Sequence, residues 1–323
     1  MVVRLLAPEA LAPLLCCPAC RAALQSEDGA YRCSAPACPL HQEGFPRLGA
    51  HSALVDFGSS ILDRDQLCAA AGASPLPRAA PRGLRGLLLP LVNPRNRIAE
   101  RNAARLAELL AARPGRALVL VVGGGSIGNG LDAFCADLRF DFVAFDIYAS
   151  ANVQFVADAH AIPLRDRSVD AVVIQAVLEH VLEPWTVATE IHRVLRDDGL
   201  VYAETPFLQQ VHEGPYDFTR FTLSGHRWLF RRFETIDCGL AGGLGSQAWW
   251  TATYLAGGLL RSQRLGNVVG LLCCWLRLLD AVVPASYSSD GACGSYFLGR
   301  KAGQALPPRA MVACYQGAQR PRG

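Results

Sequence analysis

Four glycines followed by one acid are the first residues in this sequence whose types and spacing could do chemistry. The apolar run Ala117–Val122 ends at a turn that carries Gly123, Gly124, Gly125 and Gly128. Glycine lets the chain turn sharply and brings its backbone close to a ligand. Asp146 stands 18 residues after Gly128, where a carboxylate can accept hydrogen bonds from both hydroxyls of a ribose. The pattern predicts a nucleoside-containing ligand. The alternative is a glycine turn that only packs a helix on a strand.

Two cysteine pairs near the start of the chain have the spacing of a metal site. Two residues separate Cys17 from Cys20, four separate Cys33 from Cys38, and a Glu-Asp-Gly turn lies between the pairs. Thiolates at the ends of two short hairpins can hold one tetrahedral Zn²⁺, and the metal would supply folding energy to a segment with little core of its own. The alternative is four unrelated cysteines among the 12 of the chain. Two further ligands keep the assignment open, namely Cys16 and His41.

A later stretch combines polar side chains with aromatics and has no helical or alternating period. It contains His212, Tyr216 and Asp217. A histidine can take a proton from a hydroxyl near neutral pH, and an acid such as Asp217 could orient it. We predict that these three residues are catalytic, and the alternative is a loop that is merely hydrogen-bonded. Glu179 and His180 are expected to tie down the backbone at a helix start and not to act in catalysis.

The elements that must position these residues alternate between strand and helix. Apolar, β-branched runs predict strands at 117–122, 140–146, 153–156, 168–175, 200–204, 233–237 and 295–300. Apolar periodicity and helix-stop signals predict helices at 93–113, 131–138 and 184–195. A strand, a glycine turn and a helix form the first unit of a doubly wound α/β domain, which binds ligands at the carboxyl ends of its strands. The glycine turn, Asp146 and the loop after 204 should therefore meet at one edge of a sheet.

Several motifs between about 117 and 240 belong together. They are Gly123-x-Gly125, Asp146, Asp158-Ala-His-Ala-Ile-Pro-Leu164, and Val177-Leu-Glu-His180 with Glu190-Ile-His-Arg-Val-Leu195 and Gly199 after it. With these motifs the chain resembles the class I S-adenosylmethionine-dependent methyltransferases of the type 11 group, and the resemblance returns at 295–301. It implies a Rossmann-like α/β fold, with a mostly parallel seven-stranded sheet, helices on both faces and an antiparallel last strand.

The resemblance also implies S-adenosyl-L-methionine as the cofactor. Glycines would lie under its methionine moiety, Asp146 would bind the ribose, and Asp158 would bind the adenine amine. Ile147 could pack on the adenine, and Gln175 would sit near the sulfonium. The cofactor-binding residues expected on this basis are Gly123, Gly124, Gly125, Gly128, Asp146, Ile147, Asp158, Ala159 and Gln175.

One position departs from the family's pattern. Val121 stands where an acid usually precedes the first glycine by two residues, so one contact near the methionine amino group is missing. Two other functions therefore stay open. One is an NAD(P)-binding oxidoreductase, which Gly-x-Gly-x-x-Gly favours and the segment 158–199 opposes. The other is a non-catalytic scaffold with the same fold, which Val121 favours and the retained acids oppose.

Two further resemblances concern the ends of the expected domain. Leu14–Cys20, Tyr31–Cys33 and Phe45-Pro46 resemble the short zinc-ribbon-like segments in front of some bacterial methyltransferases. The "VH…PYD…RFT" stretch of 211–222 is similar to stretches in methyltransferase-like proteins of bacterial surface-polysaccharide and lipid gene sets. The resemblance does not identify the methyl acceptor, and the candidates are a small molecule, a lipid or a glycan precursor.

Composition bounds the remaining possibilities. A net charge of +3 gives no indication of nucleic-acid binding, and a hydrophobic fraction of 51% supports a sizeable core. The apolar stretch before Cys16 is too short for a signal peptide, so a cytoplasmic protein is expected. Apolar residues in 255–284 could make peripheral membrane contact. The expected layout is a zinc-ribbon-like segment (1–60), a linker (61–92), the methyltransferase domain (93–302, with a hydrophobic insertion or cap at 241–293) and a disordered tail (303–323).

Overall fold

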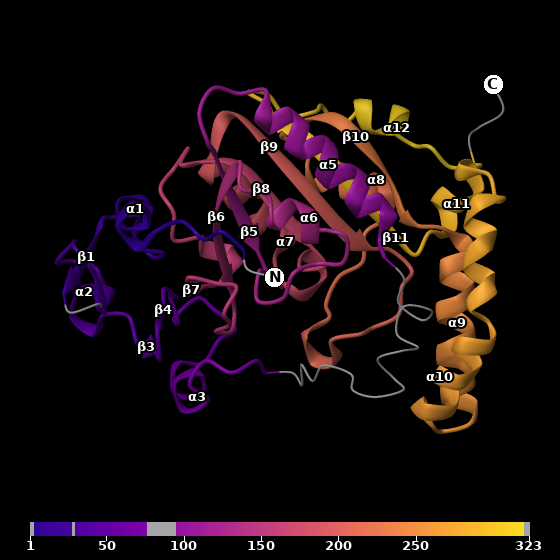
Figure 1. Cartoon of the computed structure of the whole chain (residues 1–323), viewed down its shortest axis with the longest axis horizontal. Helices are drawn as coiled ribbons and strands as arrows, with labels where there is room; N and C mark the ends of the chain where they lie inside the picture. The colour runs from indigo at the N-terminus through magenta and orange to yellow at the C-terminus, as the bar shows by residue number, and fades with distance from the viewer. Residues whose placement is uncertain (1–2, 28–29, 76–94, 320–323) are drawn as a thin grey trace.

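The computed structural model describes residues 3–27, 30–75 and 95–319. The part of the expected linker from 76 to 92 lies outside the described residues. A twisted sheet of nine strands runs through the molecule, with helices on both faces (Figure 1). The predicted α/β, Rossmann-like fold with a mostly parallel sheet is confirmed, but the sheet has nine strands where seven were predicted, because two short strands of the N-terminal segment join it.

The sheet has the strand order β10-β11-β9-β8-β5-β6-β7-β4-β3. Its strands are β3 (Arg47–Leu48), β4 (His51–Ala53), β5 (Ala117–Val122), β6 (Phe140–Asp146), β7 (Phe155–Val156), β8 (Val169–Gln175), β9 (Leu195–Pro206), β10 (Phe233–Gly242) and β11 (Gly294–Lys301). Neighbours from β4 to β9 are parallel, whereas β11 is antiparallel to both β9 and β10, as predicted for the last strand. The strand order reverses beside β5, because the chain builds β6 and β7 on one side of it and β8 and β9 on the other.

The strand β5 shows why the sheet is covered twice. Leu118 and Leu120 pack into one core cluster and Val119 into the other, as alternate residues of a strand must. The helices α5 (Arg97–Ala111) and α6 (Asp132–Cys135) cover the face of Val119, and α7 (Pro184–Val194) and α8 (Leu223–Leu229) cover the opposite face. An unbroken apolar run is therefore buried on both sides.

The N-terminal segment joins this sheet. It contains α1 (Pro8–Leu11), the 3₁₀ turn η1 (Ala12–Leu14), the hairpin β1 (Leu24–Glu27) and β2 (Ala30–Cys33), α2 (Pro39–Glu43), and, after β3 and β4, α3 (Arg64–Ala69). Strand β4 pairs in parallel with β7, with Ser52 opposite Phe155. Leu15 and Leu40 lie in the same core cluster as residues of β8 and α7. The segment thus covers an edge that a seven-stranded sheet would leave exposed.

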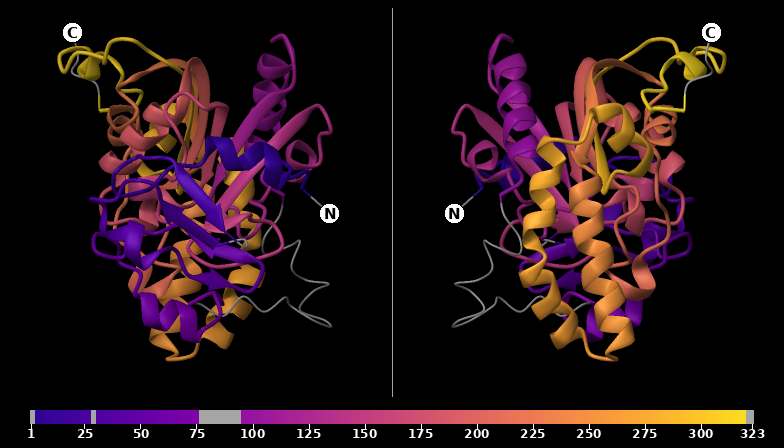
Figure 2. Two further views of the ribbon diagram at one scale, coloured as in Figure 1. Left: turned by 90° about the vertical axis from the view of Figure 1, so that its left-hand side faces the viewer. Right: turned by 90° about the vertical axis from the view of Figure 1, so that its right-hand side faces the viewer.

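A helical hairpin stands at the other end of the molecule (Figures 1 and 2). It consists of α9 (Leu244–Leu259) and α10 (Gln263–Leu272), followed by η5 (Cys274–Ala281) and α11 (Ala285–Gly291). The two helices approach closely because a side chain at Gly266 would collide with the backbone of α9. Trp249 Nε1 donates to the carbonyl of Gly270 at 2.7 Å. None of the described helices is long and apolar enough to cross a membrane.

Some boundaries differ from the predictions. The helix expected at 131–138 is the single turn α6, and the strand expected at 153–156 is reduced to β7. The tail expected to be disordered forms α12 (Ala310–Ala313), and Tyr315 and Ala318 after it donate hydrogen bonds to Asp290. The tail has no sequence period, but tertiary contacts to α11 order it as far as 319.

Candidate functional site

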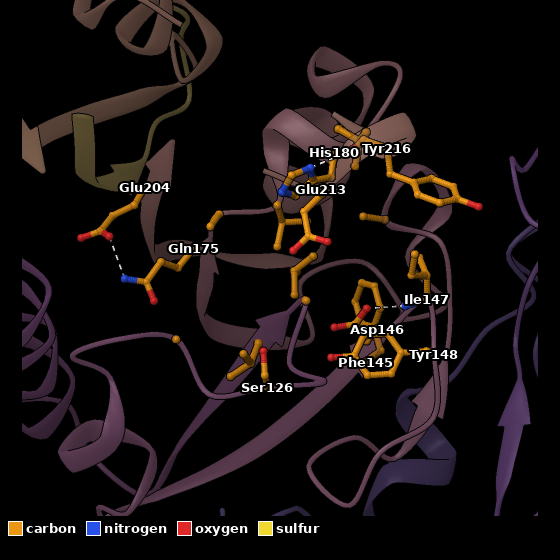
Figure 3. A pocket seen from close by; sticks show the side chains of 18 of the residues that line it. Ser126, Phe145, Asp146, Ile147, Tyr148, Gln175, His180, Glu204, Glu213 and Tyr216 are labelled. Carbon is orange, nitrogen blue, oxygen red and sulfur yellow. Dashed lines mark hydrogen bonds between the residues drawn. The ribbon is translucent and has the colours of Figure 1, made fainter. Parts of the chain in front are cut away.

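A cavity of about 460 Å³ opens where the carboxyl ends of β5, β6 and β8 meet, at the reversal of strand order (Figure 3). Open α/β sheets bind ligands at this place, and the volume suits a small molecule. Most of the residues predicted to bind a cofactor line the cavity, namely Gly123, Gly128, Asp146, Ile147, Asp158, Ala159 and Gln175. Gly124 and Gly125 belong to the turn between β5 and α6. The N-terminal segment adds lining residues that sequence reasoning missed, including Ile61, Ser74 and Pro75.

The turn after β5 requires glycine at several positions. Gly123 has φ +74°, and a side chain there would also collide with Val177. A side chain at Gly125 would collide with Tyr148, and one at Gly128 would meet the amide oxygen of Gln175. The backbone of the turn therefore forms the floor of the cavity at van der Waals distance from its walls.

Asp146 ends β6 at the cavity wall. Its Oδ2 accepts from the N–H of Gly125 at 2.8 Å. Its Oδ1 accepts from the N–H of Ile147 at 2.7 Å (Figure 3). These bonds hold the carboxylate against the glycine turn. A carboxylate oxygen has two lone pairs and can accept more than one hydrogen bond.

Asp158 lies on the same wall but has structural partners. Its Oδ1 caps a short 3₁₀ turn by accepting from the N–H of His160, and it pairs with Nδ1 of that histidine at 2.5 Å. Its Oδ2 accepts from Ser60 Oγ at 2.5 Å. Burial by itself would raise the pKa of Asp158, but the bonds from His160 and Ser60 outweigh it and lower that pKa. The loop-capping role is thus present, and Ser60 ties the N-terminal segment to the cavity.

A buried polar group that sequence reasoning missed lies at the ends of β8 and β9. Glu204 accepts from Gln175 Nε2 at 2.7 Å, from Asn96 Nδ2 at 3.0 Å and from the Tyr202 hydroxyl. Burial raises the pKa of Glu204. The Oε1 of Gln175 is buried and has no hydrogen-bond partner among the described residues. It therefore offers an unused acceptor at the cavity edge, beside Gly128.

A second cavity, of about 840 Å³, adjoins the first. Both cavities are lined by Asn96, Asn129, Ala176, Glu204, Gln209 and His212. The far wall of the second cavity comes from β10 and the helical hairpin, and includes Trp250, Leu278 and Val283. Two adjoining spaces with a common wall could hold two ligands with their reacting ends together.

Residues 124–203 match the sequence model of a methyltransferase domain. The matched stretch begins in the glycine turn and ends in β9, so it contains the carboxyl ends of β6 and β8 at the first cavity. This stretch of the chain is a methyltransferase domain.

Solved methyltransferase structures resemble this domain distantly. An S-adenosylmethionine-dependent methyltransferase from Archaeoglobus fulgidus is 12% identical over 68% of this chain and 100% of its own, with a TM-score of 0.42. A putative sarcosine dimethylglycine methyltransferase from Galdieria sulphuraria is 14% identical over 64% of this chain and 86% of its own, with a TM-score of 0.42. The 1,6-didemethyltoxoflavin N1-methyltransferase of Burkholderia thailandensis, solved with S-adenosylhomocysteine, is 16% identical over 70% of this chain and 94% of its own, with a TM-score of 0.38. No protein of curated function matches the sequence significantly.

The loop after β9 carries the three residues predicted to be catalytic, and two of them line a cavity, whereas Asp217 lines neither. His212 and Tyr216 line the first cavity, and Tyr216 is seen at its rim in Figure 3. Asp217 accepts from the N–H of His212 at 3.0 Å and lies 3.5 Å from its Nδ1. Burial would raise the pKa of Asp217, but the Arg220 guanidinium and the His212 N–H bring it to about 2. The carboxylate is therefore ionised and fixes the loop at the backbone of His212.

Glu179 and His180 tie the backbone together as expected. The carbonyl of Glu179 accepts from the N–H groups of Phe218 and Thr219, and His180 Nδ1 bonds the carbonyl of Tyr216 at 2.8 Å. The Glu179 side chain is 0% exposed, and neither carboxyl oxygen has a hydrogen-bond partner among the described residues. The backbone role therefore leaves this carboxyl unexplained.

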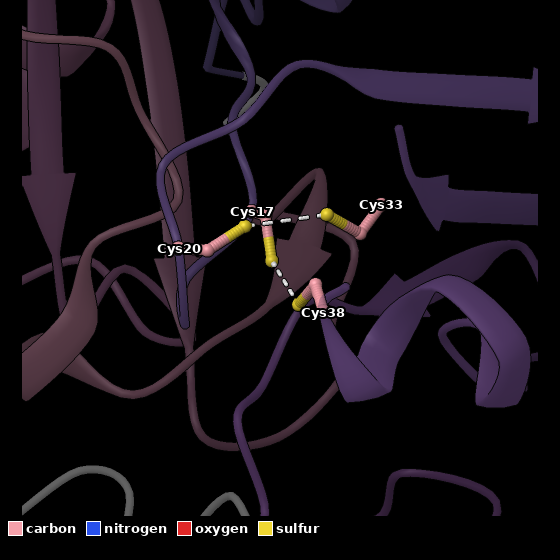
Figure 4. Close-up of side chains that lie close together, drawn as sticks. All are labelled: Cys17, Cys20, Cys33 and Cys38. Carbon is pink, nitrogen blue, oxygen red and sulfur yellow. Dashed lines mark hydrogen bonds between the residues drawn. The ribbon is translucent and has the colours of Figure 1, made fainter. Parts of the chain in front are cut away.

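Outside the methyltransferase domain, four cysteines gather at the end of the β1–β2 hairpin (Figure 4). The Sγ atoms of Cys17 and Cys38 are 3.8 Å apart, and those of Cys20 and Cys33 are 3.3 Å apart. Thiolates on one tetrahedral zinc, with bonds of about 2.3 Å, stand about 3.8 Å apart. The spare ligands stay outside the cluster, because His41 bonds the Cys33 carbonyl through Nδ1 and Cys16 pairs through its backbone with Ala23 and Pro163.

Proposed function

We propose that this domain transfers a methyl group from S-adenosylmethionine in the first cavity to an acceptor in the second. The observation that carries the proposal is the common wall of the two cavities, at the carboxyl ends of β8 and β9. S-adenosylmethionine supplies the methyl group on its sulfonium. The contribution of the chain is to hold the two reactants in line, which by itself can lower a barrier by about 7–11 kcal/mol.

The residues of the first cavity fit the cofactor. The glycine turn lets the backbone lie close to the cavity walls, since a side chain at Gly123 or Gly128 would collide with Val177 or Gln175. Asp146 can accept from ribose hydroxyls, and the unpartnered Oε1 of Gln175 can accept from an ammonium group. Gln175 and Glu204 thus place polar groups at the edge where Val121 removes the usual acid.

We further propose that the acceptor presents a hydroxyl near His212. This residue lines both cavities, and Asp217 accepts from its backbone N–H and lies 3.5 Å from its Nδ1. The loop that carries it is braced by the hairpin, because Tyr254 donates to the carbonyl of Val211 at 2.8 Å. A small molecule, a lipid or a glycan precursor would suit a second cavity with both arginine and apolar lining.

We also propose that the helical hairpin makes peripheral contact with a membrane surface. Leu255, Leu259, Leu272 and Leu278 are among its exposed apolar side chains. The stretch from 244 to 279 contains three arginines and no acid, which complements anionic lipid. Leu259→Glu should reduce sedimentation with vesicles that contain phosphatidylglycerol, whereas Leu138→Glu, at an exposed leucine outside the hairpin, should not. Equal sedimentation of both variants and the unaltered protein would argue against membrane contact.

We also propose that the four-cysteine cluster binds one structural zinc. The distances between the Sγ atoms support this proposal. In the absence of metal, burial raises the pKa of Cys33 to about 11 and also raises the pKa of Cys17. Without metal these thiols would be buried in their neutral form, and binding would release their protons. Elemental analysis should find zinc in the unaltered protein and not in the Cys33→Ser variant.

Calorimetry tests the function directly. The protein should bind S-adenosylmethionine and S-adenosylhomocysteine, and NADH should give no heat. Binding of NADH alone would favour an oxidoreductase, and binding of none of the three would favour a scaffold. The acceptor can then be sought by mass spectrometry of extracts incubated with the protein and isotopically labelled cofactor, with Asp146→Ala as the control.

A further inference from the structure

Three potential metal ligands meet at the junction of the two cavities. They are the carboxyl of Glu179 and the imidazoles of His180 and His212, and their ligand atoms all lie within 4.8 Å of one another. Glu179 lines the second cavity, His180 the first, and His212 both. The cluster therefore stands where the two proposed reactants would meet.

The spacing within the cluster suits an ion better than direct contact. Glu179 Oε1 is 3.6 Å from His180 Nε2 and 3.7 Å from His212 Nε2. Hydrogen bonds between nitrogen and oxygen are shorter than this. Ligands at about 2.0–2.2 Å from one tetrahedral ion stand about 3.3–3.6 Å apart. One ion could thus bind all three side chains, whose ligand atoms are too far apart to hydrogen-bond to one another.

Both histidines are oriented to ligate through Nε2. His180 Nδ1 lies 2.8 Å from the Tyr216 carbonyl, and His212 Nδ1 lies 3.3 Å from the Gln210 carbonyl. A carbonyl oxygen can only accept, so each Nδ1 must carry the proton and donate it. Each Nε2 then keeps its lone pair, which is the tautomer that metal-bound histidines adopt.

Glu179 supplies the independent reason for a ligand. Its side chain is fully buried, and both of its oxygens lack a hydrogen-bond partner among the described residues. A buried carboxylate without a partner is costly, and a cation removes that cost. A purely structural role needs only the backbone of this residue and leaves its carboxyl without a function.

We infer that Glu179, His180 and His212 bind a divalent transition-metal cation that holds an oxygen of the acceptor. Two imidazoles and one carboxylate leave coordination positions open, as reactive metal sites do. In this site His212 acts as a ligand, in place of the direct proton acceptor predicted from the sequence. The effect on the acceptor rests on the proposed function, whereas cation binding does not depend on it.

Manganese separates this site from the cysteine cluster, because Mn²⁺ favours oxygen and nitrogen ligands and thiolates favour zinc. The zinc-loaded full-length protein, freed of weakly held metal by brief treatment with EDTA, would be titrated with Mn²⁺ and followed by electron paramagnetic resonance. We expect one Mn²⁺ per chain by the three-ligand argument. Glu179→Gln should lose this binding, and His180→Ala should do the same. Glu183→Gln, at an exposed acid four residues away, should retain it.

Two readouts keep the test independent of folding and of methyl transfer. Glu179→Gln keeps the shape of the side chain, so its circular dichroism spectrum and its affinity for S-adenosylmethionine should match those of the unaltered protein. Equal Mn²⁺ uptake by the unaltered protein and Glu179→Gln would overturn the inference, as would no uptake by either. Failure of the proposed function would instead appear as absent cofactor binding with Mn²⁺ uptake intact.

Discussion

The four-cysteine cluster and the Glu179–His180–His212 cluster are both suited to metal, but they are built in opposite ways. The cysteines come from one short hairpin region, and their thiols face one another. The second cluster joins the loop after β8 to the loop after β9, and its members line two cavities. Four ligands close a coordination sphere and stabilise a fold, whereas three ligands at a cavity leave room for a reactant.

The difference suggests separate consequences of losing each site. The hairpin with the cysteines has little core of its own, and its segment reaches the sheet through β4 and the cavity through Ser60. Loss of the first cluster should therefore damage the fold and, through it, the cofactor cavity. Loss of the second should leave the fold intact and slow the reaction.

The largest effect is expected from Cys33→Ser. A structural zinc contributes about 10–16 kcal/mol of binding free energy, so the segment from 3 to 75 should lose its structure. Thermal denaturation should begin at a clearly lower temperature, and limited proteolysis should cut within this segment. Cys68→Ser, at an exposed cysteine on α3, is the matched control. An unchanged melting temperature in Cys33→Ser would contradict a structural role for the four-cysteine cluster.

His212→Ala should affect turnover and spare the fold. Loss of a residue that acts on the acceptor lowers turnover by about 10²-fold or more, while affinity for S-adenosylmethionine stays unchanged. His192→Ala is the control, since His192 is half-buried on α7 and bonds only the Ala302 carbonyl among the contacts described. Full turnover in a stable, cofactor-bound His212→Ala variant would contradict a role in the reaction. A parallel fall in stability and affinity would make the residue structural.

Asp146→Ala and Asp158→Ala examine the cavity that lies between the clusters. Asp146 is expected to make two charge-assisted bonds to ribose, and each such bond contributes about 1.5–3 kcal/mol. Calorimetry should therefore show a larger loss of affinity in Asp146→Ala than in Asp158→Ala, whose oxygens already serve Ser60 and His160. Unchanged affinity in both variants would place the cofactor elsewhere.

The smallest effect is expected from Ser60→Ala, which removes the bond to Asp158 and so loosens the link between the N-terminal segment and the cavity. Affinity for S-adenosylmethionine should fall about tenfold or less, because the lost bond does not touch the cofactor and its effect should not exceed the roughly 0.5–1.5 kcal/mol of an ordinary hydrogen bond. Ser59→Ala is the control, because Ser59 bonds only the exposed Asp56 turn among the contacts described. Equal affinities in the two variants would show that the segments are energetically independent.

Local patterns in the sequence were enough for much of this protein. The strand and turn of 117–128 could be predicted because an apolar run and glycines express local backbone requirements. The four cysteines could be predicted because two short spacings bring their thiols together whatever the rest of the chain does. The order of methyltransferase motifs from Gly123 to Gly199 was also sufficient to predict the domain.

Contacts between distant segments were decided only by tertiary structure. Glu204, Asn96 and Gln175 meet because β8 and β9 end side by side and α5 begins above them, which no spacing records. Strand β4 was not predicted to join the sheet, since strand pairing depends on which edge is free. His212 lies 33 positions after Glu179 in the sequence, but the fold brings its Nε2 to 3.7 Å from a carboxyl oxygen of Glu179. The sequence determined which groups are present, and the packing of the strands determined which of them share a cavity.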